Sequence, residues 1–369
     1  MSTTTPPRQL HLDLLKLIAA QLIMLHHFAV YGPLAKALDQ ADTELSDWFF
    51  NYARMAVQVF LVLGGYLAVR SLAPGGSLRA ASPWPLIWQR YQRLVLPFLA
   101  ALLLAVASAT LARYWLSDDF LPEAPTTAQL LAHATLLQGV LGYDALSAGV
   151  WYVAIDFQLF ALLTLLLWLG RSPLWGRAPL LGLMLASLFY FNRDADWDNW
   201  ALYFFGAYGL GVAAFWAAHS RHPGWRLTLL AGVGLLALAL DFRDRIALAL
   251  VVALLLGVLQ WRHNTLPEQA PWPALATRVV RLLGQSSYAL FLVHFSVLML
   301  GNALFEVLAL SGSEDAVLML LACWITSMGL SLLFERGVEA PLVRLAGRFN
   351  QGWRQAPAPQ PLQGGLKVK

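Results

Sequence analysis

Two ionisable residues, Lys16 and His27, lie inside the first long apolar stretch of the chain, from Leu12 to Tyr31. They are 11 positions apart, which is about three turns of an α-helix with roughly 20° left over, so one helix face is predicted to carry both. Ionisable groups at membrane depth are costly and usually functional. The pair, separated by roughly 16 Å along the helix axis, is therefore predicted to line a polar path. The alternative is that Lys16 extends to the near interface while His27 ends the helix at the far one.

Two pairs of charged residues are spaced three apart, so each pair shares a helix face. Asp13 precedes Lys16 by three residues, and an ion pair between them would lower the cost of holding the lysine near the membrane. A plain interfacial salt bridge is the alternative. Arg90 and Arg93 precede a later apolar stretch, where two guanidiniums can clamp a phosphate with bidentate hydrogen bonds. Arginines that only orient the chain in the membrane are the alternative.

Further polar and aromatic residues lie within or beside apolar stretches, and most have two readings. The arginine at position 54 either anchors the chain at the interface or faces a polar cavity, and the glycine pair at 64–65 serves close helix packing or ligand approach. The carboxylate at 156 is either functional or a helix-start group favoured by the helix dipole. The histidine at 294 either belongs to a site or bonds to a neighbouring helix. These candidates are Arg54, Tyr66, Trp151, Asp156, Gln158, His294 and Glu339.

Taken in order, these segments resemble the acyltransferase-3 superfamily of integral membrane acyltransferases, typified by O-antigen and exopolysaccharide O-acetyltransferases. The resemblance spans residues 12 to about 341. Three positions depart from the family pattern: Lys16 stands where arginine is usual, Gly64 where serine is usual, and Asp156 where glutamate is usual. The motifs fall on Leu12 to Lys16, Lys16 with His27, Arg54 to Tyr66, Arg90 with Arg93, Trp151 to Gln158, Gly284 to His294, and Glu339 to Pro341.

The resemblance implies transfer of an acyl group, most often acetyl, from cytoplasmic acyl-CoA to a hydroxyl of a cell-surface or exported glycan. Because an imidazole titrates near neutral pH, His27 is suited to act as the general base. Arg90 and Arg93 would bind CoA phosphates, and Lys16, paired with Asp13, would position CoA or the thioester. The other candidates would contact substrate or support the site: Arg54, Tyr66, Trp151, Asp156, Gln158, His294 and Glu339.

The expected partners are the lipid bilayer, a glycan or lipid-linked saccharide acceptor and exopolysaccharide synthesis machinery, in the bacterial inner membrane. No metal and no nucleic acid is expected. A glycan or lipid translocator with an intramembrane charged path is the alternative function, and a structural partner of an exopolysaccharide synthase is a third. An acyltransferase is expected to tolerate glutamine at His27 far less well than either alternative.

The elements that position these residues are predicted from hydropathy. The chain is 59% hydrophobic with 12% charged residues and a mean hydropathy of +0.59, which indicates an integral membrane protein. An all-α, polytopic transmembrane bundle of about ten helices follows. The apolar stretches lie near residues 12–31, 52–72, 94–116, 147–170, 179–192, 199–218, 227–241, 246–262, 282–309 and 316–335.

The connections between these stretches alternate in charge. Arginine and lysine concentrate near residues 70–93, 171–177, 221–226, 262–281 and after 336, whereas the connections near 39–47, 118–123, 194–198, 241–244 and 314–315 are acidic. The positive-inside rule therefore predicts that the basic connections and both termini are cytoplasmic. The net charge of +4 reflects this topology.

One membrane-embedded domain is predicted over residues 1–350, followed by a disordered cytoplasmic tail over 351–369 that is rich in Pro, Gln and Gly. The first apolar stretch carries Lys16 and is not followed by a small-residue cleavage site, which favours a retained helix over a removed signal peptide. Cys323 is the single cysteine, so a disulfide framework and a thiolate metal site are excluded.

Overall fold

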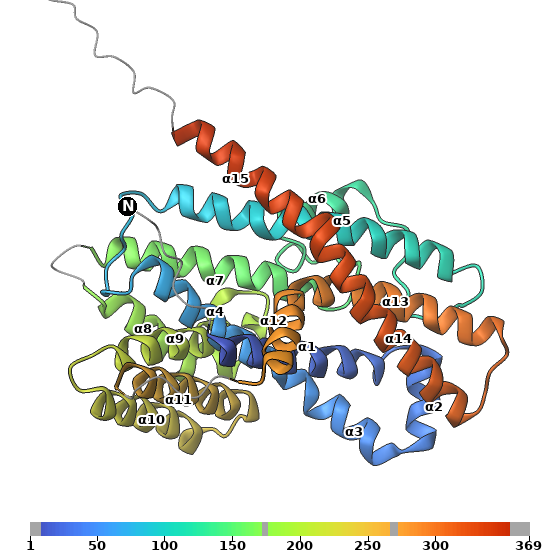
Figure 1. The fold of residues 1–369 in the computed structure, drawn as a ribbon, viewed down its shortest axis with the longest axis horizontal. Helices are drawn as coiled ribbons and strands as arrows, with labels where there is room; N and C mark the ends of the chain where they lie inside the picture. Colours follow the sequence, from blue (N-terminus) through green and yellow to red (C-terminus); the bar gives the residue numbers. More distant parts are fainter. Residues whose placement is uncertain (1–8, 172–175, 266–271, 355–369) are drawn as a thin grey trace, which may run out of the picture.

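The computed structural model describes residues 9–171, 176–265 and 272–354, and the elements in these ranges are all helices (Figure 1). The all-α prediction is confirmed for this part of the chain. The elements are α1 (Leu10–Phe28), α2 (Gly32–Ala41), α3 (Thr43–Asn51), η1 (Ala53–Ala56), α4 (Val57–Leu72), α5 (Trp84–Ala112), α6 (Thr127–Ala134), α7 (Val150–Leu169), α8 (Ala178–Phe189), η2 (Phe191–Arg193), η3 (Ala195–Trp197), α9 (Ala201–Ala218), α10 (Pro223–Leu240), α11 (Asp244–Thr265), α12 (Ala274–Gln285), α13 (Ser287–Val307), α14 (Ser313–Phe334), η4 (Glu335–Glu339) and α15 (Ala340–Arg354).

Within the described ranges, eight helical segments are long and apolar enough to cross a membrane. A ninth is added when α1 and α2, which bend by 93° relative to each other, are taken together. About ten crossings are predicted from the sequence, and α8 accounts for the difference. Its 12 residues measure only about 18 Å against roughly 30 Å of hydrocarbon.

The helices beside α8 fix the direction in which it runs. Trp151 at the start of α7 stacks on Phe204 at the start of α9, with ring centroids 5.6 Å apart, so both helices begin at the same end of the molecule. Both also end beside the segment that follows α4, because Arg171 donates to the carbonyl of Ala81 at 2.9 Å and Trp216 donates to a carbonyl of the same segment at 3.0 Å. The chain must therefore run back from the end of α7 to the start of α9, and α8 is the helix that does so.

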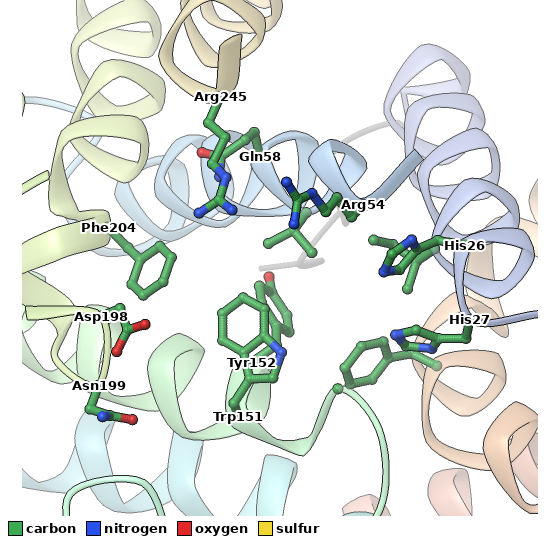
Figure 2. Close-up of a pocket in the computed structure, with 14 residues that line it drawn as sticks. His26, His27, Arg54, Gln58, Trp151, Tyr152, Asp198, Asn199, Phe204 and Arg245 are labelled. Carbon is green, nitrogen blue, oxygen red and sulfur yellow. The ribbon is translucent and has the colours of Figure 1, made fainter. Parts of the chain in front are cut away.

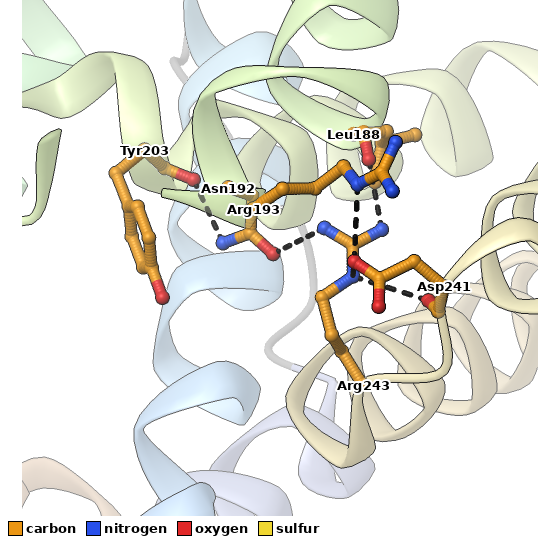
Figure 3. Close-up of polar contacts among 6 residues, drawn as sticks. All are labelled: Leu188, Asn192, Arg193, Tyr203, Asp241 and Arg243. Carbon is orange, nitrogen blue, oxygen red and sulfur yellow. Dashed lines mark hydrogen bonds and ion pairs between the residues drawn. The ribbon is translucent and has the colours of Figure 1, made fainter. Parts of the chain in front are cut away.

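A polar cluster around Arg243 surrounds the C-terminal end of α8 (Figure 3). The guanidinium donates to the carbonyl of Leu188 at 2.8 Å and to Oδ1 of Asn192 at 2.8 Å. The Asn192 amide in turn donates to the carbonyl of Tyr203 at 3.0 Å, and Nε of Arg243 lies 3.5 Å from Oδ2 of Asp241. The last carbonyls of a helix lack partners within it, so these bonds satisfy the backbone where α8 stops.

The contact between α4 and α9 depends on glycines in both helices. A Cβ atom added to Gly65 would overlap the carbonyl oxygen of Tyr208, and one added to Gly211 would overlap that of Val62. Small residues let two helix backbones approach this closely. Helix packing is therefore the use of Gly65, whereas Gly64 faces a cavity described below.

The C-terminal helices form one long segment. α14 continues through the π-helical turn η4 into α15, and the helical segment from Ser313 to Arg348 contains an apolar stretch long enough to span a membrane. α15 ends at Arg354, so it passes the predicted start of the tail at Gln351 by four residues. Residues 355–369 of that tail lie outside the described residues. The cytoplasmic position of both termini stays a prediction.

Candidate functional site

Two cavities in the described residues share a wall. The first, here called the His27 pocket, has a volume of about 360 Å³, and the second, the Arg90 cavity, has one of about 510 Å³. Tyr152 and Phe291 line both, and their rings meet edge to face with centroids 5.6 Å apart. This aromatic pair is therefore the partition between the two spaces.

The His27 pocket gathers residues from the ends of several helices (Figure 2). α1 contributes His26 and His27 from its last turn, and η1 contributes Arg54 immediately before α4. The first turns of α7, α9 and α11, together with the segment that leads into α9, supply the other sides. Their residues are Trp151, Asp198, Asn199, Phe204 and Arg245, together with Gln58 of α4.

His27 is held by a chain of hydrogen bonds that determines which of its nitrogens is basic. Nδ1 of His294 lies 2.9 Å from the carbonyl of Leu290, and because a carbonyl only accepts, this nitrogen carries a proton. Nε2 of a neutral His294 is then an acceptor, and it lies 2.6 Å from Nδ1 of His27. Nδ1 of His27 must therefore donate, which leaves the lone pair on its Nε2.

This arrangement provides a base at the pocket wall. His294 is 1% exposed and His27 is 7% exposed, yet His27 lines the pocket whereas His294 does not. The backbone leaves room beside the ring at Gly149, where φ is +81° and an added Cβ would lie 2.9 Å from the ring of Phe291 and 3.6 Å from Cε1 of His27. Nδ1 of the neighbouring His26 is hydrogen-bonded to the carbonyl of Phe49 at 3.1 Å.

The Arg90 cavity contains the predicted arginine pair, but its members differ. Arg90 forms an ion pair with Asp156 at 2.5 Å, and the two side chains are 25% and 9% exposed. The Arg90 guanidinium also lies 5.2 Å from the ring centroid of Phe160. Arg93 lines the same cavity together with Glu335 and Glu339. Arg93 is therefore the member available to a ligand, since Arg90 is already neutralised by a buried carboxylate.

Lys16 opens into the Arg90 cavity. Its ammonium lies 3.7 Å from a carboxylate oxygen of Asp13, which confirms the predicted ion pair. Gly284 permits this packing, because a Cβ there would lie 2.7 Å from the carbonyl oxygen of Asp13. Lys16 and His27 thus stand on one helix but line different cavities, which meet at Tyr152 and Phe291.

The acyltransferase-3 family model, described as an acyltransferase domain, matches residues 10–336. The chain belongs to this acyltransferase family. Comparison with the curated proteins and with the solved structures found no match. The matched residues include every cavity-lining residue named above except Glu339, so both cavities are features of the acyltransferase domain.

Four predicted site residues line neither cavity. Asp13 and His294 are described above, and the other two, Tyr66 and Gln158, also have structural contacts. Tyr66 is fully buried, and its hydroxyl donates to Oε1 of Gln260 at 2.9 Å. Oε1 of Gln158 accepts from the backbone N–H of Ala201 at 2.9 Å. Gln158 therefore holds the first turn of α9, whose preceding residues reach the His27 pocket.

Several residues of the acyltransferase cavities were not among the candidates from sequence. Asp198 is only one of several carboxylates in an acidic connection, and Arg245 follows another, so neither stands out by type or spacing. Tyr152 and Phe291 are aromatic residues in apolar helices, where core packing is the ordinary role.

Proposed function

We propose that this protein is a membrane O-acyltransferase that moves an acyl group, most often acetyl, from cytoplasmic acyl-CoA to a hydroxyl of a cell-surface or exported glycan. We place it in the bacterial inner membrane. The observation that carries the proposal is the basic Nε2 of His27, in a pocket that shares a wall with an arginine-lined cavity. Family membership supplies the reaction class.

In a direct transfer, the acceptor hydroxyl gives its proton to Nε2 of His27 while its oxygen bonds to the carbonyl carbon of the thioester. The carbon–sulfur bond then breaks, and the departing thiolate takes the proton from His27. CoA leaves as the thiol, the glycan carries the ester and the imidazole returns to its starting form. His294 accepts from Nδ1 throughout, which stabilises the imidazolium that forms between the two steps.

The Arg90 cavity is proposed to receive acyl-CoA. Arg93 offers a bidentate donor to a phosphate, and Lys16 adds a second cation in the same cavity. The ion pair with Asp156 holds Arg90 in place, which makes it a weaker phosphate ligand than its neighbour. The thioester would then lie near Tyr152 and Phe291, where the two cavities meet.

The test of the base is His27→Gln, with His26→Gln as the matched control. Loss of a general base typically costs about 10²- to 10⁴-fold in rate, so acyl ester on the glycan should fall to background in the first variant. The control should retain activity because Nδ1 of His26 is bonded to the carbonyl of Phe49 and is not part of the hydrogen-bond chain through His294. Mass spectrometry of surface glycan at matched protein levels is the measurement, and a His27→Gln variant with normal acylation refutes the assignment.

Which connections face the cytoplasm is tested separately by cysteine labelling in a Cys323→Ser background, since the buried Cys323 is the single native thiol. Glu44→Cys and Asp196→Cys, both at exposed positions in acidic connections, should react with a membrane-impermeant reagent in intact cells. Ser77→Cys, exposed in a basic connection, should react only after permeabilisation. The reverse pattern overturns the cytoplasmic position of the Arg90 cavity.

A further inference from the structure

The His27 pocket holds two arginines whose charge is not neutralised by an ion pair with the described residues. Arg54 contacts the ring of Phe50, with its guanidinium carbon 6.0 Å from the centroid. Arg245 likewise pairs with no carboxylate within 4.0 Å in the described ranges, unlike Arg90, which is paired with Asp156 in the neighbouring cavity. Unpaired guanidiniums are strong donors for carboxylates and phosphates.

The two arginines come from different elements and line one space. Arg54 lies in η1 and Arg245 in the first turn of α11, and both line the same pocket as His27 (Figure 2). Asp198 lines its far side and is the one acidic residue among the lining residues. Two cations against one carboxylate leave the pocket positive with a neutral His27.

An aromatic platform forms another side of the pocket. Trp151 is 41% exposed. Its ring stacks at 28° on that of Phe204 and meets that of Tyr152 edge to face, so two neighbours fix its orientation. Both rings line the pocket beside Asn199. An exposed indole face buries the apolar face of a sugar ring well, and an adjacent amide can bond to hydroxyls.

From this arrangement we propose that the acceptor is an anionic saccharide, whose carboxylate or phosphate group binds between Arg54 and Arg245 while the sugar ring packs on Trp151. The accepting hydroxyl then lies toward His27, within about one sugar unit of the anionic group. This inference rests on the proposed acyltransferase function and adds the chemical class of its acceptor. The lone Asp198 faces the sugar and excludes a second anionic group from that side.

The experiment uses the purified full-length protein in a neutral detergent with acetyl-CoA and three soluble oligosaccharides of matched length. One is neutral, one contains a hexuronate and one carries a sugar phosphate. Two charge-assisted hydrogen bonds lead us to expect a KM at least about tenfold lower for an anionic acceptor. The carboxylate and phosphate arms identify which anion the pocket takes. The preference should weaken at high ionic strength.

The variants Arg54→Gln and Arg245→Gln should each reduce this preference, and the double variant should abolish it. Arg193→Gln is the matched control, because Arg193 is exposed and pairs with Asp241 outside the pocket. Equal KM values for neutral and anionic acceptors in the unmodified protein overturn the proposal. So does an undiminished preference in the double variant.

Binding of the same oligosaccharides without acyl-CoA, measured by calorimetry, separates this inference from the function on which it rests. Anion-dependent binding without turnover would refute the acyltransferase reaction but retain the site. Turnover without an anion preference would retain the reaction and refute the site. Loss of the preference when anionic phospholipid is added to the detergent would assign the arginines to lipid headgroups and overturn the proposal.

Discussion

Replacing His294 with leucine tests the hydrogen-bond chain behind His27. His294 is 1% exposed and does not line the His27 pocket, so the change leaves the pocket wall intact. It removes the acceptor 2.6 Å from Nδ1 of His27. The form of His27 with its proton on Nδ1 would then bury an unsatisfied N–H, which costs about 1–3 kcal/mol.

The imidazole can avoid this cost by moving its proton to Nε2, but it then has no lone pair for the acceptor hydroxyl. The productive form is therefore disfavoured by about 1–3 kcal/mol, and kcat should fall by roughly 5- to 150-fold at 1.36 kcal/mol per tenfold. This is a smaller loss than the one expected for replacing His27 itself. Acyl-CoA affinity should not change, because His294 does not line the Arg90 cavity.

The matched variant is His294→Gln, whose side-chain amide can return an acceptor to Nδ1 of His27. The assay is acetyl transfer by the purified protein, with kcat, KM and melting temperature determined for each variant. We expect the glutamine variant to recover most of the activity. A leucine variant with unchanged kcat would refute the reasoning, and equal losses of kcat and melting temperature in both variants would assign His294 a purely structural role.

Substitutions at the two arginines of the Arg90 cavity separate binding from folding. Arg93→Ala should weaken acyl-CoA binding by about tenfold or more at unchanged melting temperature. Arg90→Ala should destabilise the fold by about 3–5 kcal/mol because it leaves Asp156 buried without its partner. Titration with acyl-CoA and thermal melting in detergent distinguish the two variants, and identical behaviour would contradict the difference drawn between these arginines. Gly65→Ala should destabilise the fold by about 1–3 kcal/mol through overpacking. Its control is Gly232→Ala, where an added Cβ meets nothing within 4 Å and stability should not fall. Comparable melting temperatures in the two variants would show that α4 and α9 can separate without cost.

The features that follow from local rules could be predicted from the sequence. Transmembrane stretches are recognisable because hydrocarbon requires long runs of apolar residues. The pairing of Asp13 with Lys16 follows from helix geometry alone, because residues three apart are neighbours. Close packing at Gly65, one of the two uses predicted for the glycine pair, follows from the same kind of rule, since close helix contact in membranes favours small residues.

The features that depend on distant contacts could not be predicted in this way. His27 meets a histidine 267 positions away, and Arg90 meets a carboxylate 66 positions away. No spacing rule connects such positions, because their approach is set by how whole helices pack. Tyr66 bonds to Gln260 in the core, and residue type alone does not distinguish a tyrosine with such a structural contact from one that contacts a ligand.

The short α8 is expected to shorten the distance that a polar solute travels into the membrane. A helix about 18 Å long that starts at one edge of a hydrocarbon layer roughly 30 Å thick ends about 12 Å below the other edge. The chain continues from there through η2 and η3. Carbonyls of this segment accept from its own backbone N–H groups, and backbone at this depth requires such partners. The same segment ends in Asp198 and Asn199, which line the His27 pocket. We therefore expect the bilayer to be effectively thinner beside His27, so that a hydrophilic molecule would reach the imidazole after crossing only part of its thickness.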